Sequence, residues 1–227
     1  AQSTPSSNVI ACSEKGLYTL DPRINKSNKT GTSKVYSTNY LFNRIASTID
    51  GNIAVGSKNG EIRMYTKIGQ NAKTMLPGAG EEITGLDLSK DGVWILATTP
   101  TYILLIPTMT TSGKTGFEKR MGKEKQKPRR LKLVNSDIVK YGLKDKSFTK
   151  ATFNNGVNTK ESFIVASIGN FIVVWKLKKV AKGNLGDYDI KQLPNPIVTS
   201  ESRYNVDNEL LVTLPKVVTK ENRKAKS

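Results

Sequence analysis

The chain has 227 residues, with 36 Lys or Arg against 19 Asp or Glu, so its formal net charge is +17. It contains no histidine and one cysteine, Cys12, which excludes disulfide scaffolds and Cys/His zinc modules and removes the usual general base of enzymes. No run of about 18 apolar residues is present, so no membrane-spanning helix is expected. Hydrophobic residues make up 37% of the chain, which is enough to bury a core.

One pattern, a turn followed by alternating apolar residues, recurs along the chain. Tyr65 and Ile106, at the ends of two such segments, are 41 residues apart, whereas Ile106 and Trp175 are 69 apart, which indicates an insertion. Alternation with a period of two is typical of strands and not of helical repeats. The four segments are residues 13–20, 57–65, 99–106 and 167–175.

Tight-turn dipeptides precede three of these segments: Asp50-Gly51, Asp91-Gly92 and Asn155-Gly156. Such a dipeptide between two β-rich runs predicts a hairpin, because both residues tolerate the left-handed backbone conformation that the turn requires. Each repeat would then consist of a hairpin, a third strand and a link to the next repeat.

Around Asp91 the pattern predicts strands at residues 83–88, 93–98 and 102–106. A period in the low forties with three or four short strands per unit predicts the blades of a β-propeller, here a partial one of about four to five blades. An antiparallel β-sandwich is the alternative. We expect blades over residues 1–183, with a further blade or a partly disordered basic tail over residues 184–227.

The insertion, residues 111–146, carries 12 basic residues against four acidic ones. We expect a mobile stretch at residues 119–130, an outer edge strand at 131–133, and a short helix at 137–141 capped by Ser136. The candidate contacts for an anionic partner are Lys119, Arg120, Lys123, Lys125, Lys127, Arg129, Arg130 and Lys132.

Three interpretations of this basic insertion are open. It is a solvated, self-repelling loop, or it docks to an acidic protein or an anionic membrane surface, or it binds nucleic acid. RNA recognition usually adds exposed aromatic residues for base stacking, and only Phe117 and Tyr141 are near. Nucleic acid is therefore the weakest of the three expectations.

No arrangement of residues predicts a catalytic, metal or cofactor site. Residues 112–115 (SGKT) look like part of a phosphate-binding loop, but Thr108 stands where that loop requires glycine. Cys12 has no histidine partner. The remaining acidic candidates, which we expect to be structural or solvated, are Glu81, Glu82, Asp87, Asp187 and Asp189. A propeller hydrolase, which would need these carboxylates to converge, is the rival hypothesis.

Six motifs follow one another along the chain: residues 16–23 (GLYTLDPR), 51–63 (GNIAVGSKNGEIR), 69–78 (GQNAKTMLPG), 91–106 (DGVWILATTPTYILLI), 116–119 (GFEK) and 175–180 (WKLKKV). In this order they resemble the motifs of the vacuolar import and degradation protein family, whose plant relatives are called defective embryo and meristems proteins. The resemblance covers about residues 1–183. The third strands carry no Trp-Asp pair, and without histidine no Gly-His occurs.

This resemblance implies a C-terminal WD40-like propeller that follows, in the whole protein, a region like a pleckstrin-homology domain. The chain would be the later part of that propeller. We therefore expect a non-enzymatic protein-interaction scaffold with protein partners, in cytoplasmic vesicle-linked import and degradation, with the nucleus as the alternative location. Nucleic-acid or anionic-membrane binding through the basic insertion is the alternative function.

Overall fold

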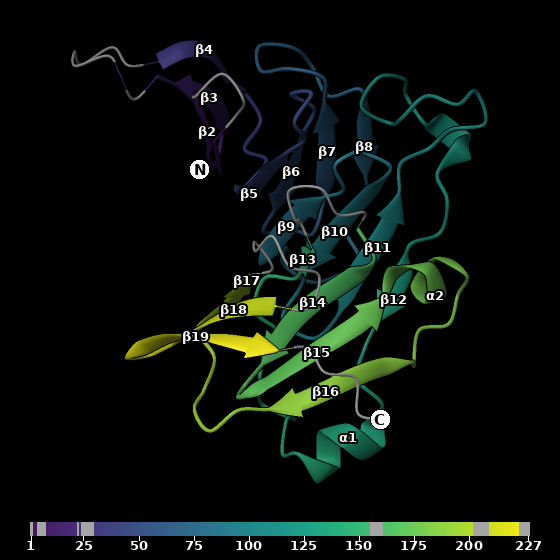
Figure 1. Ribbon diagram of the computed structural model, residues 1–227. Helices are drawn as coiled ribbons and strands as arrows, with labels where there is room; N and C mark the ends of the chain where they lie inside the picture. The colour runs from purple at the N-terminus through teal and green to yellow at the C-terminus, as the bar shows by residue number, and fades with distance from the viewer. Residues whose placement is uncertain are drawn as a thin grey trace. The chain divides into compact units, whose positions relative to one another are not determined.

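A computed structural model of the chain describes residues 2–3, 8–21, 23, 30–154, 161–201 and 209–222. These residues form five antiparallel sheets and three short helical segments (Figure 1). The expected all-β class is confirmed. None of the described helices is long and apolar enough to cross a membrane.

In each sheet the strands are neighbours in their chain order, so every sheet is a simple meander. The first sheet holds β1 (Gln2–Ser3), β2 (Val9–Ser13), β3 (Gly16–Leu20) and β4 (Thr30–Val35). The second holds β5 (Phe42–Ser47), β6 (Ile53–Ser57), β7 (Ile62–Tyr65) and β8 (Thr74–Leu76). The third holds β9 (Gly85–Leu88), β10 (Trp94–Thr98), β11 (Ile103–Pro107) and β12 (Arg129–Leu131).

The last two sheets follow the same plan. The fourth holds β13 (Thr152–Phe153), β14 (Phe163–Ile168), β15 (Phe171–Lys176) and β16 (Tyr188–Gln192). The fifth holds β17 (Thr199–Glu201), β18 (Glu209–Leu214) and β19 (Val217–Asn222). The helical segments are η1 (Gly122–Glu124), α1 (Asn135–Lys140) and α2 (Leu177–Ala181). Residues 184–227 thus contribute β16 to the fourth sheet and all described strands of the fifth.

The predicted hairpin turns are present at two of the three dipeptides. Gly51 has φ 88° and Gly92 has φ 68°, the left-handed region that glycine adopts without strain. The carboxylate of Asp91 accepts hydrogen bonds from the hydroxyl of Ser89 at 2.6 Å and the amide of Val93 at 3.0 Å. The third dipeptide, Asn155-Gly156, lies outside the described residues.

Two boundaries in the insertion differ from expectation. The edge strand expected at residues 131–133 is β12, because Arg129 pairs with Leu105 and Leu131 with Ile103. The helix expected at residues 137–141 is α1, which begins earlier, because the carbonyl of Val134 accepts the amides of residues 137 and 138. Ser136 therefore lies inside α1 and caps nothing; no side chain caps this helix.

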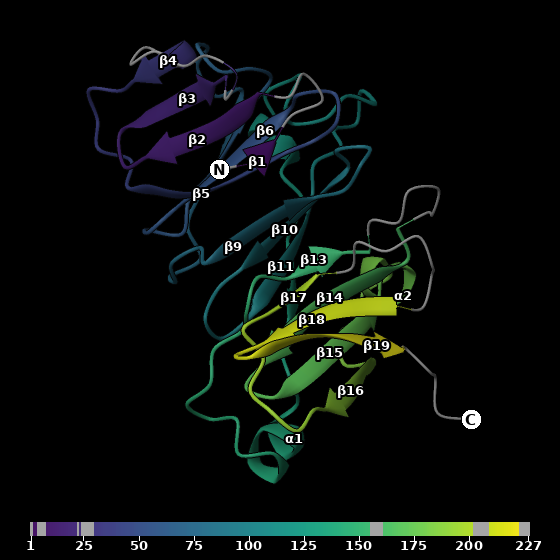
Figure 2. The same ribbon diagram turned by 60° about the vertical axis from the view of Figure 1, so that its left-hand side comes forward.

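The chain divides into two compact units, residues 1–97 with 106–128 and residues 98–105 with 129–227. In the first unit β5 packs against β2 and β9 (Figure 2). A buried cluster lies between the first and second sheets; it contains Ile10, Leu17, Phe42, Ile53, Val55, Tyr65 and Ile68. Successive sheets therefore bury their apolar faces against one another, as stacked blades do.

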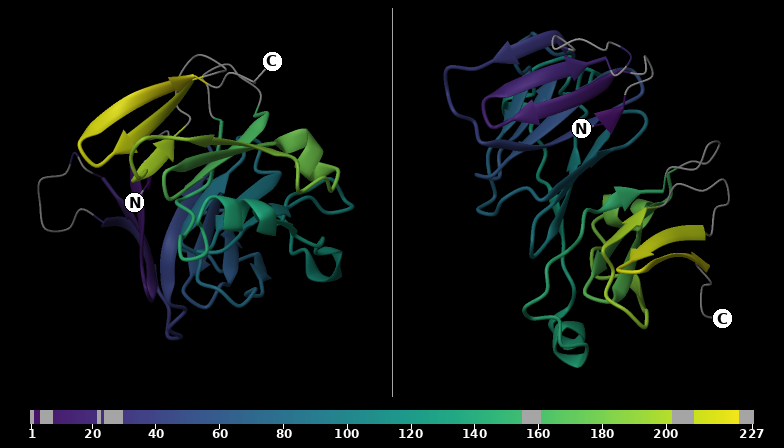
Figure 3. Two further views of the ribbon diagram at one scale, coloured as in Figure 1. Left: turned by 90° about the horizontal axis from the view of Figure 1, so that it is seen from below. Right: turned by 90° about the vertical axis from the view of Figure 1, so that its left-hand side faces the viewer.

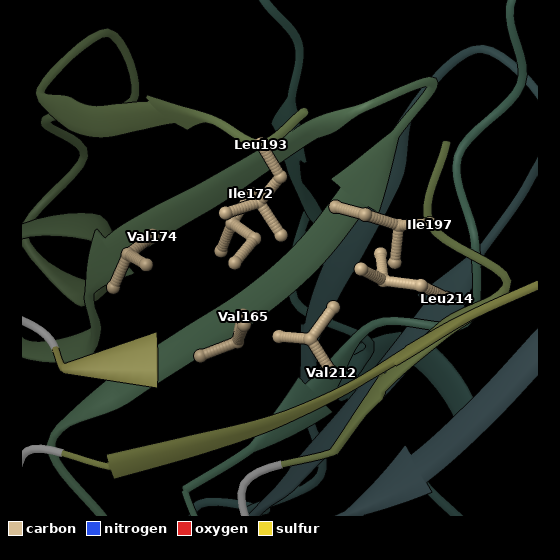
Figure 4. Close-up of a cluster of buried hydrophobic side chains, with 7 residues drawn as sticks. All are labelled: Val165, Ile172, Val174, Leu193, Ile197, Val212 and Leu214. Atoms are coloured by element: carbon tan, nitrogen blue, oxygen red, sulfur yellow. The ribbon is translucent and has the colours of Figure 1, made fainter. Parts of the chain in front are cut away.

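In the second unit the fifth sheet lies beside the fourth, with β17 packed against β14 (Figure 3). Figure 4 shows the apolar side chains between them pointing toward one another. The cluster contains Val165, Ile172, Val174, Leu193, Ile197, Val212 and Leu214. The fifth sheet is thus held by the same kind of packing as the second.

Candidate interaction surface

Residues 108–128, which we call the basic loop, follow β11 and belong to the first unit. At its start the hydroxyl of Thr108 donates to the carbonyl of Gly92 at 2.6 Å. Met109 and Thr115 then form an antiparallel bridge across a turn at Gly113, where φ is 76°. The residues that look like a phosphate-binding loop therefore make a hairpin-like turn, followed by a second turn instead of a helix.

Two apolar side chains anchor the basic loop: Phe117 is 0% exposed and Met121 1% exposed. The hydroxyl of Thr66 donates to the carbonyl of Phe117 at 2.9 Å, and the amide of Met121 donates to the hydroxyl of Thr74, in β8, at 3.2 Å. The stretch expected to be mobile thus contains one residue, Met121, whose side chain is buried and whose backbone amide is bonded to the second sheet. Sequence reasoning missed these anchors because their partners lie about fifty residues away.

Two carboxylates in the basic loop serve the loop's own backbone. Glu118 accepts hydrogen bonds from the amide and the hydroxyl of Thr115, both at 2.9 Å. Glu124 accepts from the amide of Thr111 at 2.7 Å and from its hydroxyl at 2.9 Å. These bonds, with the amide donors foremost, hold the pKa of each carboxyl below its ordinary value.

Most cations of the basic loop, unlike its two carboxylates, do not bond to the loop itself. Lys119 lies 3.6 Å from Glu124 and donates to the hydroxyl of Ser112 at 3.3 Å. The side chains of Arg120, Lys123, Lys125 and Lys127 are exposed, and in the described part of the chain none of them forms an ion pair or a side-chain hydrogen bond.

The other three candidates belong to the second unit, because the division between the units falls after residue 128. Arg129 and Arg130 are in β12, and Lys132 follows it. The guanidinium of Arg130 lies 4.4 Å from the ring centroid of Tyr102, and the ammonium of Lys132 lies 5.7 Å from it. A cation this close to an aromatic face is attracted by the ring quadrupole. The eight predicted contacts therefore fall into two groups, and they stay a prediction.

The ring of Tyr102 was not among the predicted residues. It immediately precedes Ile103, which pairs with Leu131. If the pairing of the edge strand with β11 had been known, Tyr102 would have been placed opposite Lys132. That strand pairing is the information that the sequence alone did not provide.

The acidic candidates are dispersed between the two units. Glu82 accepts a hydrogen bond from the side-chain nitrogen (Nδ2) of Asn43 at 2.8 Å, and Asp187 forms an ion pair with Lys179. Asp87 is buried within β9, whereas Asp189 is exposed in β16. Among the described residues no three His, Cys, Asp or Glu side chains are grouped to hold a metal ion.

Cys12 is half-buried in β2. Burial raises the pKa of its thiol, although Arg44 acts in the opposite direction. A raised pKa reduces the thiolate fraction, and the thiolate is the nucleophilic form. The environment of Cys12 is thus that of a packed side chain.

Comparison with solved structures supports the fold. A chain in the crystal structure of the mitotic checkpoint complex superimposes with a TM-score of 0.62 at 10% sequence identity, covering 94% of this chain and 57% of that one. At this identity the similarity concerns the fold alone, and that fold is a WD40-like propeller.

Two curated relatives carry the name vacuolar import and degradation protein 27. The one from Schizosaccharomyces pombe is 38% identical over 224 residues, covering 95% of this chain and 28% of the relative. The one from Saccharomyces cerevisiae is 34% identical over 226 residues, covering 94% of this chain and 29% of the relative. The chain thus spans less than a third of the length of either relative.

The family model that matches is described as the VID27 C-terminal WD40-like domain, and the match extends over residues 1–227. The family resemblance carried by the motifs is therefore confirmed. Those motifs, the five antiparallel sheets and the match along the whole chain agree: the chain belongs to the VID27 family and represents its C-terminal WD40-like domain.

Proposed function

We propose that this chain is a non-catalytic protein-interaction platform that acts in the cytoplasm, in vesicle-linked import and degradation of proteins. The observation that carries the proposal is the set of loops that the stacked sheets hold at fixed positions. The names of the curated relatives support the biological process.

The loops are held by their own side chains. The hydroxyl of Ser57 donates to the side chain of Asn59, and the hydroxyl of Ser89 donates to that of Asp91, so the two turns repeat one arrangement. In a third turn the hydroxyl of Thr48 accepts the amide of Asn52 at 3.1 Å. These bonds restrain the turns before any partner arrives.

Restrained loops suit binding, because less conformational entropy is lost when a partner orders them. Contact residues on such loops keep their relative positions, which provides specificity without a reactive group. The same property explains how one sheet architecture serves many unrelated partners.

The test uses the full-length protein, tagged and cross-linked in cells with a lysine-reactive reagent. We expect cross-links to partner proteins at exposed lysines of this chain, such as Lys58 and Lys67. We also expect that deleting residues 1–227 removes those partners and slows degradation of the captured proteins. The proposal fails if partners and degradation are unchanged by the deletion, or if all cross-links arise elsewhere in the protein.

A further inference from the structure

We infer that the basic loop is a docking surface for an extended acidic segment of a partner protein, contacted by Arg120, Lys123, Lys125 and Lys127. The inference rests on the proposed interaction role and adds the chemistry of the partner. It concerns the first unit alone.

The first argument is charge without internal compensation. Within the described chain these four cations have no carboxylate partner, while Glu118 and Glu124 accept hydrogen bonds from Thr115 and Thr111. Because those carboxylates face the backbone they stabilise, they leave the outward cations uncompensated. Such a surface attracts anionic partners over roughly one Debye length, about 8–10 Å at physiological salt.

The second argument is that the loop is held in one shape. Phe117 and Met121 are buried, and their backbones are bonded to Thr66 and Thr74. A solvated, self-repelling loop would need none of these anchors. The cations therefore project from a loop whose backbone is already ordered, which reduces the entropy lost on binding.

The third argument is spacing. Lys125 has an extended backbone, with φ −60° and ψ 113°, and Lys127 precedes a proline, which also favours extension. Between them the side-chain amide of Gln126 donates to the carbonyl of Met109 at 3.4 Å. Successive residues of an extended chain point to opposite sides, so residues two apart share a side and lie about 6.6 Å from each other. Lys125 and Lys127 therefore match carboxylates at alternate positions of an extended peptide.

The same observations disfavour the other anionic partners. Base stacking requires an exposed aromatic ring, and the one aromatic residue of the loop, Phe117, is fully buried. Insertion at a membrane surface requires exposed apolar side chains, and no large exposed hydrophobic residue lies in residues 108–128. An acidic protein segment needs neither.

The experiment measures fluorescence anisotropy of a labelled peptide in which glutamate alternates with serine, titrated with the full-length protein. The test variant is R120Q/K123Q/K125Q/K127Q. The matched control, K144Q/K146Q/K178Q/K182Q, removes the same charge from exposed lysines of the second unit. Poly(U) RNA and phosphatidylserine vesicles are titrated in parallel, and thermal unfolding confirms that both variants are folded.

We expect the test variant to bind the peptide at least about tenfold more weakly than the unmodified protein, and the control variant to change by less than about twofold. The affinity should also fall as salt rises from about 50 mM to about 300 mM. Absence of peptide binding, an equal loss in both variants, or loop-dependent binding of RNA or vesicles in place of the peptide would overturn the inference. Each of these results leaves the cross-linking test of the interaction role unaffected.

Discussion

The hydroxyl of Tyr188 donates a hydrogen bond of 2.5 Å to the Oδ2 atom of Asp137. The same hydroxyl accepts the amide of Val134 at 3.0 Å. A residue of β16 thus holds the first turn of α1, whose start no side chain of its own caps. Burial, followed by the bond to Asp137, raises the pKa of Tyr188 to about 12.

Replacing this hydroxyl should loosen the helix. Tyr188→Phe removes both hydrogen bonds and leaves the amide of Val134 without its acceptor, at an expected local cost of about 1–2 kcal/mol. Hydrogen exchange at the amides of α1 measures the effect. Tyr141→Phe is the matched control, because the Tyr141 hydroxyl forms no hydrogen bond with any residue that the structure describes. Equal exchange in both variants would contradict the role of Tyr188.

High pH should remove the hydrogen bond that Tyr188 donates to Asp137, while the phenolate oxygen still accepts the amide of Val134. The folded-state pKa of Tyr188 lies above the ordinary value of 10, so its contribution to stability is complete below pH 10 and is lost as the pH rises through about 12. The carbon NMR signal of the Tyr188 ring should titrate together with faster exchange in α1. In Tyr188→Phe the increase in α1 exchange at alkaline pH should be absent. If the increase is unchanged in this variant, groups other than Tyr188 cause it.

Acid should release the basic loop. The pKa values of Glu118 and Glu124 lie below the ordinary 4.5, so their contribution is present above pH 4.5 and is lost as the pH falls through the lowered values. The amide signals of Thr115 and Thr111 should shift upfield as each carboxylate is protonated. In Glu124→Gln only the amide of Thr115 should still respond; a persistent response at Thr111 would argue against the assigned bond.

Two glycines in equivalent turns should differ in their tolerance of alanine. Gly60 has φ 83°, and a Cβ atom there would lie 2.6 Å from the carbonyl oxygen of Glu81. Gly51 has φ 88°, but its Cβ would meet nothing within 4 Å. We expect Gly51→Ala to cost about 1–2 kcal/mol of unfolding free energy and Gly60→Ala at least about 1 kcal/mol more. Urea denaturation measures both, and equal costs would contradict the close approach.

The fifth sheet offers a matched pair of valines. Val212 in β18 is 0% exposed within the cluster of Figure 4, whereas Val218 in β19 is 61% exposed. Val212→Ala should lower the unfolding free energy by about 1.5–3 kcal/mol and Val218→Ala by less than about 0.5 kcal/mol. Thermal or urea unfolding of the full protein gives both values. Similar values would mean that the fifth sheet does not pack on the fourth.

Features determined by neighbouring residues were predictable from the sequence. Asp50-Gly51 and Asp91-Gly92 mark hairpins because their turn geometry depends on those residues themselves. The strands expected at residues 83–88, 93–98 and 102–106 correspond to β9, β10 and β11, with ends that differ by one or two residues. Alternation within a strand is equally local, so it was visible without tertiary contacts.

Features determined by distant partners were not predictable. Residues 119–130 were expected to be mobile because their charges repel one another, yet the hydroxyl of Thr74 accepts the amide of Met121 within that stretch, and Thr66 holds the backbone at Phe117 just before it. The limits of β12 depend on pairing with β11, and the start of α1 depends on the carbonyl of Val134. For the basic residues the sequence identified the charges, but not which of them the carboxylates leave unpaired.

In the basic loop, one set of residues determines the backbone conformation and a different set carries the positive charge. Phe117, Met121, Glu118 and Glu124 determine the conformation, while Arg120, Lys123, Lys125 and Lys127 carry the sign. Substitutions in the second set leave the first untouched. The charge of this loop can therefore change without a change in its backbone, and a copy with inverted charge at these four positions would attract cationic peptides on the same backbone.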